Sequence, residues 1–385
     1  MPLYEGIGLI GEKQLPPVCL DIGSAYTKCG FCGETGPRAI IPTRVKLDGQ
    51  ERSVFDYRNR EDLDRLLVAL LETIYFRRLL VSPKDRPVVV AESLLTPTIF
   101  RDVLASVLFR HYEVSCLLLA PSHLLALMPL GLQTGLVLDI GHEEAVCIPV
   151  YEGVPVLRAW QALPLAARAV HRSLRAALKE HGSVVDPAGR SVEQVVDSLS
   201  DAVVEDIKVR GVLVAPSAPS DSAGSEPIPV PLPYPLPGGV TLTVAGRSRL
   251  LPAEVLFTAD ADNQTLATML LDALLQCPLD SRRPLAASLV VLGGTAHLPG
   301  IKARLLSEVR RQAALPPYSE TLHLDTFRMH RPPAKANYLT WLGGAMFGGT
   351  DVVLTRSLTR EKYLELGALP DWCSLATPVA DSRGV

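Results

Sequence analysis

The sequence predicts an α/β protein that folds as two lobes on related sheets. The chain has 385 residues, which is too long for one simple hydrophobic core. Short β-branched runs alternate along it with stretches of helical period. A strand–turn–strand unit that contains Asp-Ile-Gly occurs twice, at residues 21–23 and 139–141. The repeat predicts two lobes, each of which offers a hairpin tip to a shared cleft.

Composition and charge narrow the class of protein. Hydrophobic residues make up 48% and charged residues 21%, as in soluble globular proteins. The net charge of −3 gives no electrostatic reason to expect binding to nucleic acid or to an anionic membrane. Seven scattered cysteines do not form a secreted disulfide framework, and the N-terminus lacks a signal-peptide pattern. The apolar stretch 116–140 contains proline, histidine and glutamine, so it does not read as a membrane span. We expect a protein of the cytoplasm.

Strands and helices of the first half follow from apolar periodicity. The expected strands are 18–20, 26–31, 86–93 and 114–121, and the expected helices are 61–80, 101–111 and one that starts at Ser122. Residues 43–60 are short, polar and irregular in pattern.

The second half is expected to be more helical. Its strands fall within 135–150 and before Gly293, and helices are expected over 166–180, from the capping box Ser191/Gln194 towards Lys208, over 262–276 and from Pro299. Residues 215–238 are rich in proline and serine and predict an extended insertion. This insertion is either a plain surface loop or a proline-rich docking ligand.

Cys29 and Cys32 have the C-x-x-C spacing of redox and zinc sites. Such a site would need a second ligand pair, or a helix N-terminus at the cysteines. Here the two cysteines fall on the second strand of the first hairpin and just beyond it. We therefore predict two buried or half-buried thiols.

Several stretches, in order along the chain, resemble the actin family. They are "DIGSAYTKCGFCGETGPRAIIP", "LVLDIGHEEAVCIPVYEG", "DIKVR", "VVLGGTAHLPGI", "YLTWLGGAMF" and "TREKYLELG". The resemblance implies an actin-like ATPase fold, with duplicated mixed sheets around a nucleotide cleft. It implies a first lobe over 1–134 with a reduced insertion at 43–60, a second lobe over 135–330 with a Pro-rich insertion at 211–240, and a return to the first lobe over 331–385.

Other stretches are similar to one class within that family, the pointed-end actin-related proteins of dynactin, the activator of cytoplasmic dynein. They are "MPLYEG", "FRRLLVSPKDR", "LLAPSHLLAL", "PPAKAN" and "LPDWCSL". This resemblance implies a cytoskeletal protein whose partners are actin-like filament subunits, other pointed-end subunits and, indirectly, dynein and cargo adaptors. It implies no nucleic acid and no membrane insertion. The Pro-rich insertion and the tail 370–385 are candidate partner contacts.

The resemblance also implies which residues would hold ATP or ADP. The first hairpin would hold phosphate through Asp21, Gly23, Ser24 and Lys28, and the second would contribute Asp139 and Gly141. The base and sugar would lie near Lys208, Gly293, Gly294 and Thr295. Asp21 and Asp139 would act through water on Mg²⁺. Alternatively, each aspartate merely caps its turn.

The reaction centre departs from the family pattern. Val146 stands at the family's catalytic histidine, and Ser122 stands where a glutamine positions the attacking water. Glu143 and Glu144 fall where the γ-phosphate is expected, and Ala167 replaces a glycine near the ribose. We interpret His142 as a solvated loop residue. We therefore predict structural nucleotide binding without hydrolysis, with no catalytic residue.

Residues 43–60 are too few for the small lobe that a neighbouring filament subunit grips in actins. Because filament contacts are head-to-tail, a subunit that lacks one face can join an end but cannot be extended. This predicts a pointed-end cap. The alternatives are an active ATPase or kinase of the wider superfamily, and a nuclear actin-related protein.

Overall fold

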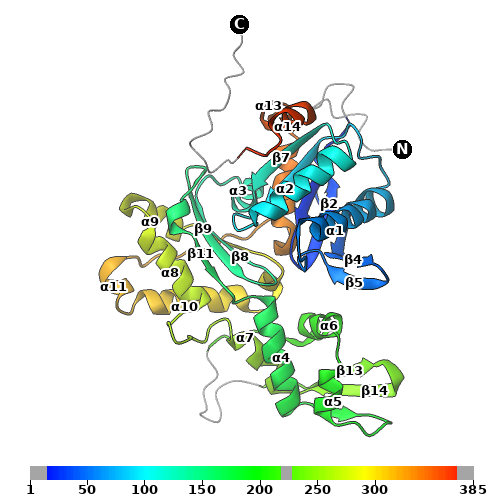
Figure 1. The fold of residues 1–385 in the computed structure, drawn as a ribbon. Helices are drawn as coiled ribbons and strands as arrows, with labels where there is room; N and C mark the ends of the chain where they lie inside the picture. The colour runs from blue at the N-terminus through cyan, green and yellow to red at the C-terminus, as the bar shows by residue number, and fades with distance from the viewer. Residues whose placement is uncertain (1–14, 218–227, 371–385) are drawn as a thin grey trace. The chain divides into compact units, whose positions relative to one another are not determined.

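The computed structural model describes residues 15–217 and 228–370. The chain divides into two compact units (Figure 1). Unit 1 comprises Met1–Leu125 and Thr340–Val385, and unit 2 comprises Ala126–Leu339. The lobe limits expected at 134 and 330 remain predictions. Among the described residues, none of the helices is both long and apolar enough to span a membrane.

Unit 1 is built on a six-stranded mixed sheet in the order β16-β7-β6-β1-β2-β3. The strands are β1 (Val18–Ile22), β2 (Tyr26–Phe31), β3 (Ala39–Pro42), β6 (Val88–Glu92), β7 (Cys116–Pro121) and β16 (Leu358–Thr359). β1 pairs in parallel with β6, and β6 with β7, whereas the other pairs are antiparallel. The strands expected from the sequence are therefore confirmed.

Two helices, α1 and α2, pack together in unit 1 (Figure 1) and share a core with the sheet. α1 (Arg60–Glu72) is followed by a π-helical segment, Thr73–Leu79, and α2 (Thr98–Ser106) by another, Val107–His111. The amide of Asp62 donates to the Asn59 side chain, which begins α1. The buried leucines of α1 lie three or four positions apart, as the sequence predicts. Unit 1 also contains α13 (Val352–Arg356) and α14 (Arg360–Leu366), and the chain passes from one unit to the other within α3 (Ser122–Leu127) and within α12 (Leu339–Gly348).

Residues 43–60 are not irregular, and that expectation is wrong. They form an antiparallel hairpin of β4 (Arg44–Leu47) and β5 (Gln50–Ser53). Asp48 and Gly49 make its two-residue turn, and both have positive φ. Asp-Gly between short strands is a strong hairpin signal, which the polar composition of the stretch obscured.

Unit 2 contains a five-stranded mixed sheet in the order β10-β9-β8-β15, with β11 also paired to β9. The strands are β8 (Gly135–Ile140), β9 (Ala145–Tyr151), β10 (Val154–Pro155), β11 (Gln161–Leu163) and β15 (Leu289–Leu292). β8 and β15 are parallel, which places the carboxyl ends of both strands at one edge.

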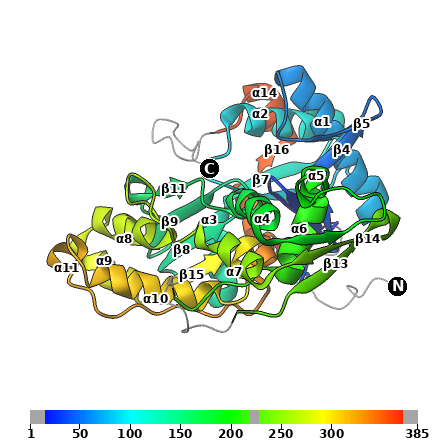
Figure 2. The same ribbon diagram turned by 90° about the horizontal axis from the view of Figure 1, so that it is seen from below.

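The helices of unit 2 lie around this sheet and a second, smaller one (Figure 2). They are α4 (Ala167–His181), α5 (Val192–Asp197), α6 (Asp201–Gly211), α7 (Gly246–Glu254), α8 (Leu266–Gln276), α9 (Leu279–Ala286), α10 (Ile301–Ala313) and α11 (Tyr318–Thr321). The small sheet has the order β12-β14-β13, with β12 (Ser183–Val185), β14 (Val240–Val244) and β13 (Leu232–Leu236).

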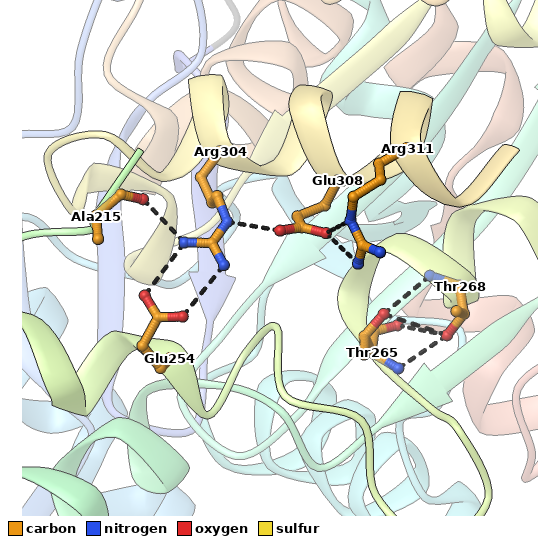
Figure 3. Close-up of polar contacts among 7 residues, drawn as sticks. All are labelled: Ala215, Glu254, Thr265, Thr268, Arg304, Glu308 and Arg311. Carbon is orange, nitrogen blue, oxygen red and sulfur yellow. Dashed lines mark hydrogen bonds and ion pairs between the residues drawn. The ribbon is translucent and has the colours of Figure 1, made fainter. Parts of the chain in front are cut away.

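Three boundaries in unit 2 differ from expectation. The capping box at Ser191 and Gln194 is present, but its helix ends at Asp197. A new helix starts at Asp201, because the Ser200 side chain accepts a hydrogen bond from the Val203 amide. Likewise α8 begins only after Thr265, whose hydroxyl accepts from the Thr268 amide (Figure 3).

The Pro-rich insertion is partly a strand. β13 contains Pro233 and Pro235 and pairs only with β14, so it is an edge strand, where missing amides are tolerated. Residues 218–227 of the insertion lie outside the described residues.

A buried ion network ties α10 to α7 in unit 2 (Figure 3). The guanidinium of Arg304 contacts Glu308 at 2.8 Å and Glu254 at 3.2 Å, and it donates to the carbonyl of Ala215 at 3.0 Å. Glu308 also accepts from Arg311 at 2.7 Å. Burial alone would raise the pKa of Glu308, but the bonds from Arg311 and Arg304 outweigh it and lower that pKa.

Candidate functional site

The first predicted phosphate hairpin joins β1 to β2 in unit 1. Asp21 lies opposite Lys28 in the strand register, and its carboxylate is 3.1 Å from the Lys28 ammonium. Both side chains are half-buried. The structure thus brings together a carboxylate and a cation at the base of a short turn that also contains Gly23 and Ser24.

Gly23 fixes the shape of this turn. Its amide donates to the Tyr26 carbonyl at 3.2 Å, and a Cβ at this position would lie 2.9 Å from that oxygen. Its carbonyl accepts from the Thr43 hydroxyl at 2.6 Å, and Thr43 is in turn 2.9 Å from the Thr27 hydroxyl. The turn is therefore held from both sides, as a preorganised backbone site requires. The sequence analysis missed Thr43, which lies beyond the quoted motif.

The second hairpin joins β8 to β9 in unit 2. Asp139 is the residue before the last of β8 and lies opposite Val146 in the register, and the amide of Gly141 donates to the Glu144 carbonyl at 3.1 Å. The first amides of α4 close the turn from outside, because Ala167 and Arg168 donate to the carbonyls of Gly141 and His142. The carbonyls of the turn accept hydrogen bonds from amides that have no partner within the helix, and these bonds fix the turn to α4.

Gly293 locks the end of β15 against the same hairpin. It has φ +96°, and a Cβ there would lie 2.3 Å from the Ile140 carbonyl oxygen and 2.4 Å from Asp139 Oδ1. The buried Thr295 hydroxyl donates to the Gly141 carbonyl at 2.7 Å. Gly294 is exposed instead, and a Cβ there would meet no atom within 4 Å. The structure therefore joins Asp139, Gly141, Gly293 and Thr295 in one rigid corner.

Lys208 lies on α6 within a different set of contacts. Its side chain is only 5% exposed, and its ammonium is 2.7 Å from Glu205 Oε2. Glu205 also accepts from His171 Nε2 at 2.8 Å. Burial would raise the pKa of Glu205, but the bonds from His171 and Lys208 outweigh it and lower that pKa to about 2. Lys208 is thus already engaged by a carboxylate that the sequence analysis did not single out.

His142 is not the freely solvated residue that the sequence predicts. Its side chain is 28% exposed and its ring lies edge-on to His171, with centroids 5.6 Å apart. Burial lowers the pKa of His142, and the neighbouring side chains of His171 and Lys208 lower it further. The prediction failed because α4 and α6, which are distant in sequence, surround the loop.

Glu143, Val146 and Ser122, which the resemblance to actins places around the reaction centre, all have ordinary structural surroundings. Glu143 forms an ion pair with Arg168 at the start of α4. Val146 is buried in β9 between the neighbouring strands β8 and β11, and its side chain has no group that transfers a proton. Ser122 is buried in unit 1, with its hydroxyl 3.1 Å from His123 Nδ1.

The two C-x-x-C cysteines are buried, as predicted. Cys29 lies on β2 and Cys32 directly after it. Burial raises the pKa of the Cys29 thiol to about 11, so the thiol is protonated at neutral pH. A protonated, buried thiol is a poor nucleophile and a poor metal ligand.

Two side chains near the second hairpin, His171 and Glu205, were missed by the sequence analysis. The only local signal was the spacing of Glu205 and Lys208, which places both on one helix face. His171 had a weaker signal, as a polar residue on the buried face of α4.

Both hairpins fit a nucleotide with Mg²⁺ in residue type and backbone shape. Each has an aspartate one residue before the end of its first strand, and a glycine where a Cβ would approach a backbone carbonyl at 2.9–3.1 Å. Small residues let backbone amides approach phosphate oxygens, and carboxylates suit Mg²⁺ and its water.

A sequence profile of the Actin family matches residues 59–374, which is more than half of the chain. The chain belongs to the actin family. The matched range contains the second hairpin, α6 and the Gly293–Thr295 turn, while the first hairpin lies before it. The two units on mixed sheets are therefore an α/β actin fold, as the sequence predicted.

One curated relative extends the actin-family likeness to nearly the whole chain. Actin-related protein 10 from Dictyostelium discoideum is 25% identical over 424 aligned positions. The alignment covers 92% of this chain and 88% of that protein. The predicted resemblance to an actin-related protein is confirmed.

Proposed function

We propose that this actin-related protein is a non-enzymatic structural subunit of dynactin that caps the pointed end of its actin-like filament. In that place it anchors other pointed-end subunits and supports dynein-driven transport along microtubules, with dynein and cargo adaptors as indirect partners. The similarity to Actin-related protein 10 supports the class of protein. One structural feature of unit 1 supports the proposed capping role.

That feature is the size of the β4–β5 hairpin. The hairpin consists of two four-residue strands and a two-residue turn, and with Thr43 and residues 54–59 it makes up the whole segment between β3 and α1. The hairpin is tied to α1 by an ion pair of Arg52 with Asp62 at 2.7 Å, and by one of Arg65 with Asp48 at 2.9 Å. Val45 is buried in the same core as the α1 leucines. The segment is therefore part of unit 1 and too small to form a separate gripping lobe.

A filament subunit needs two different faces, because each one binds the next head-to-tail. A chain with one complete face and one reduced face can add to a filament end. The next subunit then lacks the lobe that it would grip, and growth at that end stops. The resemblance to actins implies that the missing lobe belongs to the pointed-end face, so the complete face would dock on the pointed end of the filament.

The second part of the proposal is that the protein binds ATP or ADP with Mg²⁺ as a structural ligand. Asp21, Gly23, Ser24 and Lys28 would contact phosphate from unit 1, and Asp139 and Gly141 from unit 2. Gly293, Gly294, Thr295 and Lys208 would lie near base and sugar, and Asp21 and Asp139 would hold Mg²⁺ through water. Val146 and Ser122 supply no base or water-positioning group, which supports binding without hydrolysis.

Capping is tested by mixing the purified full chain with preformed actin-like filaments and following each end by microscopy. We expect labelled protein at one end only, and elongation blocked there while the other end still grows. Growth at the opposite end is the internal control. Incorporation along the filament length would contradict capping.

A further inference from the structure

Two imidazoles and one carboxylate converge in unit 2. His142 comes from the β8–β9 turn, His171 from α4 and Glu205 from α6. Each offers one donor atom, and the three atoms all lie within 4.8 Å of one another. His171 is buried and the other two residues are half-buried. Across the described ranges 15–217 and 228–370, no other three histidine, cysteine or acidic residues converge in this way.

The bonds that already join this group use one of the two carboxylate oxygens of Glu205. Oε2 of Glu205 accepts from His171 at 2.8 Å and from Lys208 at 2.7 Å. Oε1 takes part in neither bond. The ring of His142 stands edge-on to that of His171, at an interplanar angle of 67°. The donor atoms of the two rings and of the carboxylate therefore lie close enough together to converge on one ion.

We propose that His142, His171 and Glu205 bind a divalent transition-metal ion, with zinc as the best match. Two imidazole nitrogens, one carboxylate oxygen and a water form a common tetrahedral zinc set, whereas Mg²⁺ takes oxygen ligands. Zinc bonds of about 2.0–2.2 Å place ligand atoms roughly 3.3 Å apart, which small side-chain rotations can reach from the observed spacing.

The charge of Lys208 affects how tightly this site would bind a metal ion. Its charge next to Glu205 opposes metal binding, and it neutralises the carboxylate when no metal is present. A metal held through Oε1 can leave the Lys208 bond to Oε2 in place, as an outer hydrogen bond that orients the ligand. Replacing Lys208 with methionine should therefore tighten binding.

The metal would join three elements that are distant in sequence. The β8–β9 turn is already bonded to the start of α4, and α4 is bonded to α6 through His171 and Glu205. A bound ion would link all three elements at one point. An ion that binds only the folded unit stabilises it. This inference does not rest on nucleotide binding, because none of its three ligands is a proposed phosphate contact.

The test uses the full chain, freed of metal with a chelator and titrated with Zn²⁺ against a chromogenic competitor. Co²⁺ serves as a spectroscopic substitute, since its visible absorption distinguishes tetrahedral from octahedral ligation. We expect one zinc per chain and a tetrahedral cobalt spectrum. Zinc affinity should fall about tenfold or more in His142→Asn and in Glu205→Gln, and rise in Lys208→Met.

His111→Asn is the matched control, because His111 is an exposed histidine in unit 1. It should bind zinc like the parent chain. His142 is at a half-buried turn, so His142→Asn should fold, and far-UV circular dichroism checks that it does. The proposal is overturned if the parent chain binds no zinc, or if one zinc per chain persists in both His142→Asn and Glu205→Gln. Bound nucleotide is measured in the same samples, so that failure of the zinc site can be distinguished from failure of the nucleotide proposal.

Discussion

At the scale of single residues, the buried guanidinium of Arg304 needs carboxylate and carbonyl partners within unit 2. Its side chain is 2% exposed and lies between Glu254 and Glu308. A buried ion pair gives little net stability over an apolar packing, but removal of one partner leaves the other charges unpaired. The cost of substitution therefore depends on burial rather than on the number of ion pairs.

Arg304→Met should lower the free energy of unfolding by about 3–5 kcal/mol, because Glu254 and Glu308 lose their shared cation. Arg311→Met is the matched control. Arg311 also contacts Glu308, but its side chain is 57% exposed, so its loss should cost about 1 kcal/mol or less. Urea unfolding at neutral pH measures both. Equal losses in the two variants would show that burial does not set the cost.

At the scale of elements, local signals predicted the central strands of the two larger sheets and most helix positions. The capping box at Ser191 and the buried run of β6 are confirmed, since both depend on neighbouring residues. The β4–β5 hairpin was missed although Asp48-Gly49 is a local signal, because its strands are polar and only Val45 is buried. The His142–His171–Glu205 group could not be predicted, because its members meet only when α4, α6 and the β8–β9 turn pack together.

The Gly293–Gly294 turn offers a matched pair of substitutions within one element. Gly293→Ala places a Cβ against the Ile140 carbonyl at positive φ, so we expect a loss of roughly 2 kcal/mol or more of unfolding free energy. Gly294→Ala meets no atom within 4 Å and has φ −64°, so stability should change by about 0.5 kcal/mol or less. Thermal and urea unfolding measure both.

The same pair tests the nucleotide proposal. If the bare backbone at Gly294 lies against a sugar or base, Gly294→Ala should retain less nucleotide than the parent chain while it remains as stable in nucleotide-free form. Unchanged nucleotide content in this variant would remove Gly294 from the proposed contacts without affecting the structural role of Gly293.

At the scale of the whole molecule, the actin fold frames the proposal that this protein binds a nucleotide without hydrolysing it. Binding needs the two rigid hairpins, whose glycines and aspartates are present. Hydrolysis needs a positioned water and a group that accepts its proton, and the positions expected for these hold Ser122 and Val146. A ligand bound to the folded state at 100 times its Kd would add about 2.7 kcal/mol of stability.

The nucleotide is identified by denaturing the purified chain and separating what it releases by chromatography. We expect close to one nucleotide per chain, recovered as ATP, and a lower Tm after Mg²⁺ is removed with a chelator. Asp21→Asn and Asp139→Asn should release nucleotide faster, because each weakens the hold on the Mg²⁺ water shell, while Asp325→Asn, an exposed acid in unit 2, should not. Recovery of ADP alone, with phosphate released on incubation, would contradict the non-hydrolysing protein and favour an active ATPase. Recovery of no nucleotide, with Tm independent of Mg²⁺, would contradict the proposal that a nucleotide is a structural ligand. It would not bear on the capping role, which depends on the reduced β4–β5 face and is tested separately at the filament end.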